Sequence, residues 1–132
     1  MYLLDTDIVI FSLKGVERVV SAFHDHRHCS MAVSAVTYGE LVYGAEASAR
    51  REENLAYVYR VAELYPVLPV TRAIMDSFGR LKSDLRRVGM PLDEFDLLIA
   101  CTALTHGLTL VTNNTRHFDR VPGLRLANWA GG

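Results

Sequence analysis

The sequence predicts an α/β fold: a three-layer α/β/α sandwich in which helices cover both faces of a central parallel sheet of about five strands. Short apolar runs alternate along the chain with longer segments whose apolar residues recur at helical spacing, which is the pattern of βαβ units. Half of the residues are hydrophobic and 22% are charged, as is typical of a packed globule. At 132 residues the chain is expected to form one domain, residues 1–132.

Five short apolar runs are expected to form the strands. They are residues 2–5, 30–34, 67–70, 108–111 and 124–127. Short apolar strands separated by helices predict parallel pairing, because each crossover helix covers a face of the sheet. Pro69 favours an edge position for the third run, since proline has no N–H to donate to a neighbouring strand.

Six segments have the spacing of helices. They are residues 7–14, 16–25, 34 or 37 to about 48, 50–64, 71–88 and 94–106. The third begins at Ser34 or Thr37, because either hydroxyl can accept a free backbone N–H at the start of a helix. Gly89 and Gly107 are expected to end the last two helices.

Composition and charge narrow the class of protein. No apolar run approaches the roughly 20 residues of a membrane span, and Asp5 interrupts the N-terminal apolar stretch where a signal peptide needs continuity, so we expect a cytoplasmic protein. Two cysteines are too few for a disulfide framework. The net charge is −1, but 12 of the 14 basic residues are arginine, which suits phosphate recognition.

Three acids stand where a site is expected in this kind of fold. Asp5 directly follows the first strand, Glu40 lies in the first two turns of the helix after the second strand, and Asp96 lies in the first turn of a markedly apolar helix. Ligands bind at the carboxyl ends of parallel strands. The alternative for Asp5 and Asp96 is that each only caps its helix, and for Glu40 that it is an ordinary surface residue.

Carboxylates gathered at one crevice repel each other and raise one another's pKa unless a cation is bound. An all-oxygen set without cysteine or histidine suits Mg²⁺ or Mn²⁺ better than Zn²⁺. Such ions polarise phosphoryl oxygens and activate water. By contrast, the histidines of "HDHRH", residues 24–28, have no further Cys or His pair spaced to complete a zinc site and are expected to form a solvated helix end.

Four motifs, "YLLDTD", "VTYGELVYGAE", "DEFDLLIA" and "LVTNNTRHFDRVPGLRLANW", make the whole chain resemble the PIN-domain ribonucleases, above all the VapC toxins of bacterial toxin–antitoxin pairs. The resemblance implies an Mg²⁺-dependent endoribonuclease, with a structured tRNA loop as a plausible substrate, held inactive by a VapB-type antitoxin. It also implies a homodimer assembled with the antitoxin, and metal-holding roles for Asp5, Glu40 and Asp96.

The chain departs from the family pattern at three positions. Asp7 replaces the Asn of the first motif, and either adds a carboxylate near the metal or caps the short helix that follows. Asn114 stands where many PIN domains have Asp, and His117 where many relatives have an acid. Asn114, Asp119 or a water is therefore expected to complete the site, although Asp119 also fits a solvated turn residue.

Two other functions remain open at this stage. Asp5-Thr6-Asp7 after a strand resembles the Asp-x-Asp of haloacid-dehalogenase-like phosphatases, but Ile8-Val9 stands where that motif needs Gly-Thr. A non-catalytic PIN-like binding module is favoured by the amide at Asn114 and opposed by the three retained acids. Tyrosines on the helices at about 37–48 and 50–64 leave room for a groove that accepts an antitoxin helix, or for a dimer face.

Overall fold

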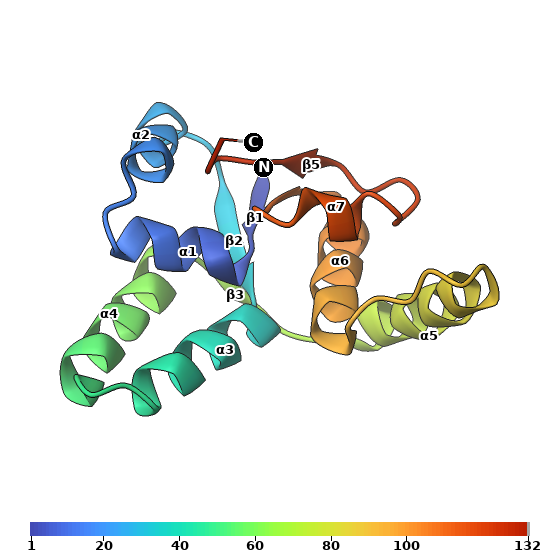
Figure 1. The fold of residues 1–132 in the computed structure, drawn as a ribbon, viewed down its shortest axis with the longest axis horizontal. Coiled ribbons are helices and arrows are strands. Elements are labelled where there is room, and N and C mark those ends of the chain that lie inside the picture. Colours follow the sequence, from blue (N-terminus) through green and yellow to red (C-terminus); the bar gives the residue numbers. More distant parts are fainter. Residues whose placement is uncertain (132) are drawn as a thin grey trace.

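Within residues 1–131, which are the residues that the structure describes, the computed structural model has five strands and seven helices (Figure 1). The strands are β1 (Tyr2–Leu4), β2 (Met31–Ser34), β3 (Val67–Leu68), β4 (Thr109–Val111) and β5 (Leu126–Ala127). The helices are α1 (Thr6–Leu13), α2 (Glu17–Asp25), α3 (Ala35–Glu46), α4 (Arg51–Leu64), α5 (Arg72–Arg87), α6 (Glu94–His106) and α7 (Thr115–Phe118).

All neighbouring strands of the sheet are parallel, in the order β3-β2-β1-β4-β5. The chain runs outward from β1 through β2 to β3, and then returns to place β4 on the other side of β1. The strand order therefore reverses between β1 and β4, and the carboxyl ends of these two strands border the crevice where open α/β sheets bind ligands.

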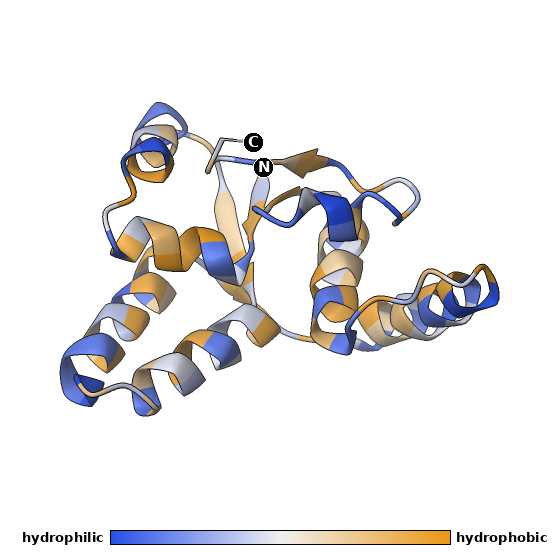
Figure 2. Cartoon of the chain, viewed as in Figure 1, coloured by the Kyte–Doolittle hydropathy of each residue, from blue (hydrophilic) through white to orange (hydrophobic). Residues whose placement is uncertain are grey.

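Successive residues of each strand point to opposite faces of the sheet, and each face has its own apolar core. Leu4, Val33 and Val111 belong to the core under α1 to α4, whereas Leu3 and Leu110 belong to the core under α6 and α7. Figure 1 shows these two groups of helices on either side of the sheet, with α5 packed outside α6. In Figure 2 the strands are largely hydrophobic and the outer helix surfaces carry most of the hydrophilic colour. The three-layer sandwich is thus confirmed.

Nearly every element lies where the sequence predicts it, and the differences have local causes. Ser34 is the cap of α3: its Oγ accepts the N–H of Thr37 at 3.0 Å, while Thr37 itself lies inside the helix. β3 is an edge strand as expected, but it ends at Leu68, before Pro69. The four-residue helix α7 was not predicted, because it is too short to show a helical apolar spacing in the sequence.

The histidine-rich segment is only partly the solvated helix end that was predicted. His24 and His28 are exposed, but the ring of His26 stacks on Trp129 at 4.6 Å between centroids, and its Nδ1 lies 2.7 Å from the carbonyl oxygen of Ala22. His26 therefore closes the α2 end of the core instead of facing water.

Candidate active site

Asp5 is the buried centre of the site. It is only 4% exposed, and both of its carboxylate oxygens are hydrogen-bonded. Oδ1 accepts the backbone N–H of Thr6 at 2.8 Å, which caps α1, and Oδ2 accepts the hydroxyl of Thr112 at 2.7 Å. Thr112 directly follows β4, so this second bond spans the point where the strand order reverses. Burial raises the pKa of Asp5 and outweighs the lowering by these two donors.

Glu40 reaches the same crevice from α3. Its Oε1 accepts the hydroxyl of Thr6 at 2.7 Å, and the Thr6 oxygen lies 3.1 Å from that of Thr37, which is fully buried. A hydroxyl has a single proton. Because Thr6 gives its proton to the carboxylate, the bond between the two threonines requires Thr37 to donate to Thr6. Glu40 is therefore oriented by a short chain of hydroxyls and is more than an ordinary surface glutamate.

Asp96 approaches from the opposite face of the sheet, in the first turn of α6. It does not cap that helix, because Asp93 does so: the Asp93 Oδ2 accepts the N–H of Phe95 at 3.1 Å. Burial is the largest cause that raises the pKa of Asp96 to about 6, and the charges of Asp5, Asp93 and Glu40 add to it, while His117 opposes them. The three predicted acids thus reach one region from the end of β1, from α3 and from α6, and the charges of Asp5 and Glu40 both raise the pKa of Asp96.

Asp7 lies beside them and is not the cap of α1, because Asp5 has that role. Its Oδ2 accepts the backbone N–H of Asn113 at 3.3 Å, and its Oδ1 is buried without any partner. Burial, followed by the charge of Asp5, raises the pKa of Asp7 to about 6. Of the two roles open from the sequence, capping is therefore excluded.

Asn114 and Asp119 lie at the two ends of α7, and both are exposed. The backbone N–H of Asn114 donates to the Thr112 hydroxyl at 3.0 Å, so this residue helps to hold the loop that contacts Asp5. Neither side chain forms a hydrogen bond or ion pair within residues 1–131. His117, on the same helix, is the α7 residue whose charge acts on Asp96.

Thr6, Thr37 and Thr112 orient the acids but were not among the predicted site residues. Threonine is common in strands and helix caps, so the residue type alone does not indicate a site. The positions of these threonines do indicate one. Thr6 lies between two acids, and Thr112 is the first residue after a strand that ends at the site edge.

The acids suit a hard divalent cation, because every atom with which they could coordinate a metal is an oxygen. Within residues 1–131, no three His, Cys, Asp or Glu side chains already converge closely enough to hold an ion together. Two of the carboxylates are instead turned toward hydroxyl donors. The buried, unpartnered oxygen of Asp7 fits a cation site, as do the raised pKa values of Asp7 and Asp96, to which burial contributes most and neighbouring acids add.

Comparison with known proteins shows the family of the chain. The family model of the PIN domain matches residues 2–124. A tRNA(fMet)-specific endonuclease VapC from Shigella flexneri is 40% identical over 98% of both chains, and ribonuclease VapC2 from Haemophilus influenzae is 37% identical over 97% of both. A crystal structure of DNA-bound VapBC from Salmonella typhimurium has a TM-score of 0.90 at 36% identity over 97% of both chains. The chain therefore belongs to the PIN-domain family, and within that family to the VapC ribonucleases.

This membership makes the chain an enzyme and is incompatible with the phosphatase alternative. It also disfavours a binding module without catalysis, since the relatives are named as nucleases. PIN-domain ribonucleases generally depend on divalent metal ions. No helix within residues 1–131 is long and apolar enough to cross a membrane.

The raised pKa of Asp96 predicts a pH-dependent effect of Asp96→Asn on the metal-free protein. The folded protein binds this proton more tightly than the unfolded chain, for which the pKa is 3.8, so ionised Asp96 destabilises the fold above about pH 6. In chelator at pH 7.5 the variant should be more stable than the wild type by about 1–2 kcal/mol. The difference should vanish as the pH falls from about 6 to 4. Urea unfolding at several pH values measures it.

Asp76→Asn is the matched control, because Asp76 is exposed on α5. A stabilisation by Asp96→Asn that persists at pH 4, or that the control reproduces, would contradict the raised pKa of Asp96.

Proposed function

We propose that this chain is the toxin of a VapBC-type toxin–antitoxin pair and hydrolyses RNA phosphodiester bonds with Mg²⁺, for which Mn²⁺ can substitute. The observation that carries the proposal is the gathering of Asp5, Glu40 and Asp96 from three elements at the crevice between β1 and β4. The relatives named as VapC ribonucleases support it. The name of the Shigella flexneri relative favours tRNA as the substrate class.

Each side chain has a distinct task in this proposal. Asp5, Glu40 and Asp96 hold the ion, which when bound polarises the scissile phosphate and activates water. Thr112 keeps Asp5 oriented, and Thr6 keeps Glu40 oriented. A bound cation favours the ionised form of Asp96, so the pKa of this carboxyl falls when the site is loaded. The charge of His117 lowers the pKa of Asp96, and in this proposal His117 contacts a phosphate of the RNA.

Asp5→Asn and Asp96→Asn should each abolish growth arrest and Mg²⁺-dependent RNA cleavage. Losing a residue that only orients a metal ligand costs roughly 10- to 100-fold, so losing a ligand should cost at least about 100-fold in cleavage rate. Cleavage of a total tRNA pool by the purified protein, with and without EDTA, measures this loss. Asp76→Asn is the matched control and should cleave as the wild type does.

A wild type that neither arrests growth nor cleaves RNA after removal of the antitoxin would contradict the nuclease function. Full activity of Asp96→Asn would contradict the site assignment and leave the function standing.

Asn114, rather than Asp119, is proposed to complete the site, and alanine variants test this choice. Asn114 borders the loop that contacts Asp5, so Asn114→Ala should raise the Mg²⁺ concentration needed for half-maximal cleavage about tenfold. Asp119 is exposed at the far end of α7, so Asp119→Ala should leave this concentration within about twofold. The reverse order would make Asp119 the residue that completes the metal shell.

The antitoxin is proposed to bind a groove between α1, α3 and α4, which we call the antitoxin groove. Its lining is mostly apolar and comprises Ile10, Leu13, Lys14, Glu40, Leu41, Gly44, Ala45, Asn54, Tyr57 and Val58. Because Glu40 lies at its end, an apolar segment seated here would also lie beside the site. The VapBC complex from Salmonella typhimurium supports an antitoxin partner. A homodimer within the toxin–antitoxin assembly is part of the same proposal.

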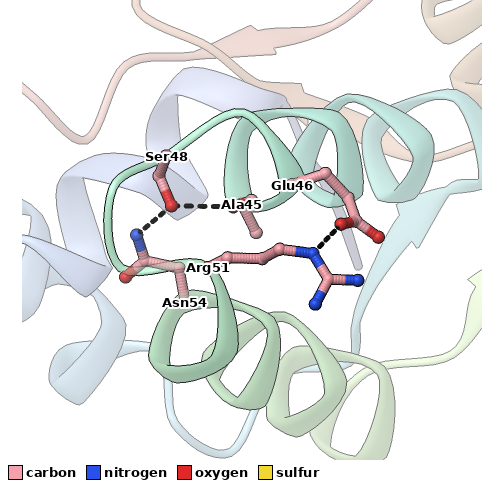
Figure 3. A network of polar contacts seen from close by, with 5 residues as sticks. All are labelled: Ala45, Glu46, Ser48, Arg51 and Asn54. Carbon is pink, nitrogen blue, oxygen red and sulfur yellow. Dashed lines mark hydrogen bonds and ion pairs between the residues drawn. The ribbon is translucent and has the colours of Figure 1, made fainter.

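One wall of the antitoxin groove is fixed by the turn between α3 and α4. Figure 3 shows the contacts: Asn54 Nδ2 donates to Ser48 Oγ at 2.9 Å, Ser48 Oγ donates to the Ala45 carbonyl at 2.7 Å, and Arg51 pairs with Glu46. Ala45 and Asn54 thus belong both to this network and to the lining. The turn that supplies part of the groove lining is therefore fixed by contacts within the chain itself.

Tyr57→Ala should weaken antitoxin binding by roughly tenfold or more, because a half-exposed tyrosine in an apolar groove is a typical anchor for a partner. Tyr59→Ala is the matched control: Tyr59 is equally exposed on α4, but it is outside the lining. Titration of antitoxin into RNA-cleavage reactions measures both. Equal effects of the two substitutions would contradict this location for the groove.

A further inference from the structure

Asp7 contains a buried polar atom that the rest of the protein leaves without a partner. Its Oδ2 accepts the backbone N–H of Asn113, whereas its Oδ1 is buried with no hydrogen bond. No Lys, Arg or His within residues 1–131 forms an ion pair with this carboxylate. Burying a charged oxygen without a partner costs several kcal/mol in general. Asp7 Oδ1 therefore has no hydrogen bond or ion pair within residues 1–131 to offset its burial.

A structural role does not require aspartate at this position. Asp5, and not Asp7, caps α1. The bond from Asn113 needs only one acceptor oxygen, which the amide of an asparagine would supply equally well. An asparagine would also remove the repulsion between Asp7 and Asp5. What an aspartate adds is one further negative charge and one further free oxygen.

The structure assigns that oxygen to the cation: we propose that Asp7 Oδ1 is a ligand of the divalent metal, beside Asp5, Glu40 and Asp96. The inference rests on the metal dependence proposed above and extends the ligand set by one carboxylate. A cation supplies the missing partner of Oδ1 and also neutralises the repulsion between Asp5 and Asp7.

The loop after β4 holds both N-terminal acids in place for this role. Thr112 donates to Asp5 through its hydroxyl, and the next residue, Asn113, donates to Asp7 through its backbone. One oxygen of each acid is thereby fixed by consecutive residues of the same loop. For Asp7 this leaves Oδ1 free, and a carboxylate oxygen of Asp5 that accepts a hydrogen bond keeps a second lone pair for a metal.

The experiment uses the full-length protein and its Asp7→Asn variant, which keeps the shape of the side chain and the bond from Asn113. Mn²⁺ binding is measured by isothermal titration calorimetry, and thermal unfolding is recorded in EDTA and in Mn²⁺. The variant should bind Mn²⁺ about tenfold more weakly. In EDTA its Tm should be higher than that of the wild type, because the new amide donates to the Asp5 carboxylate. The increase in Tm from EDTA to Mn²⁺ should be smaller for the variant than for the wild type.

Asp76→Asn controls for the charge change and should match the wild type in both measurements. The higher Tm in EDTA also shows that Asp7→Asn is folded. Unchanged Mn²⁺ affinity in Asp7→Asn, with normal binding by the wild type, would overturn the role of Asp7 alone. A wild type that binds no Mn²⁺ would overturn the proposed metal dependence and the role of Asp7 with it.

Discussion

The hydrogen bond from Thr112 to Asp5 joins the two strands on which the whole site depends. β1 and β4 are adjacent in the sheet but separated by more than a hundred residues of chain, and this bond closes the crevice between their carboxyl ends. The backbone of the same loop engages Asp7, and Asp5 in turn caps the helix whose first hydroxyl orients Glu40. Four polar contacts around Asp5 therefore tie two helices, α1 and α3, to the carboxyl ends of β1 and β4.

The sequence was sufficient for the five strands and for every described helix except α7, and it singled out Asp5, Glu40 and Asp96 as candidate acids, because these features have strong local signals. Alternation of apolar strands with helices fixed the layers, and the position of Asp5 after a strand placed it at the crevice. Hydroxyl-bearing residues such as Thr112 have no such signal, since their role comes from a partner 107 positions away. Asp7 was left between two roles, because only the structure shows that the cap of α1 is taken and that one oxygen is orphaned.

The acids that are proposed to bind the metal also lower the stability of the folded protein when they are ionised. The raised pKa values of Asp7 and Asp96 mean that their charged forms are less favourable in the folded protein than in the unfolded chain. The two apolar cores on either side of the sheet must offset this cost. Stability and activity are thus set by different parts of the chain: the cores hold the strands in register, and the strand ends hold like charges together.

The position of β4 beside β1 has a consequence for the order in which the sheet can form during synthesis. β4 is one of the last strands to be synthesised, yet it inserts beside β1, the first. Until residues 109–112 emerge, one edge of β1 has no neighbour, and Asp5 lacks the donor that orients it. The residues that line the proposed antitoxin groove all precede residue 59, whereas Thr112 follows β4. Asp5 therefore acquires its second hydrogen-bond donor only after β4 has joined the sheet.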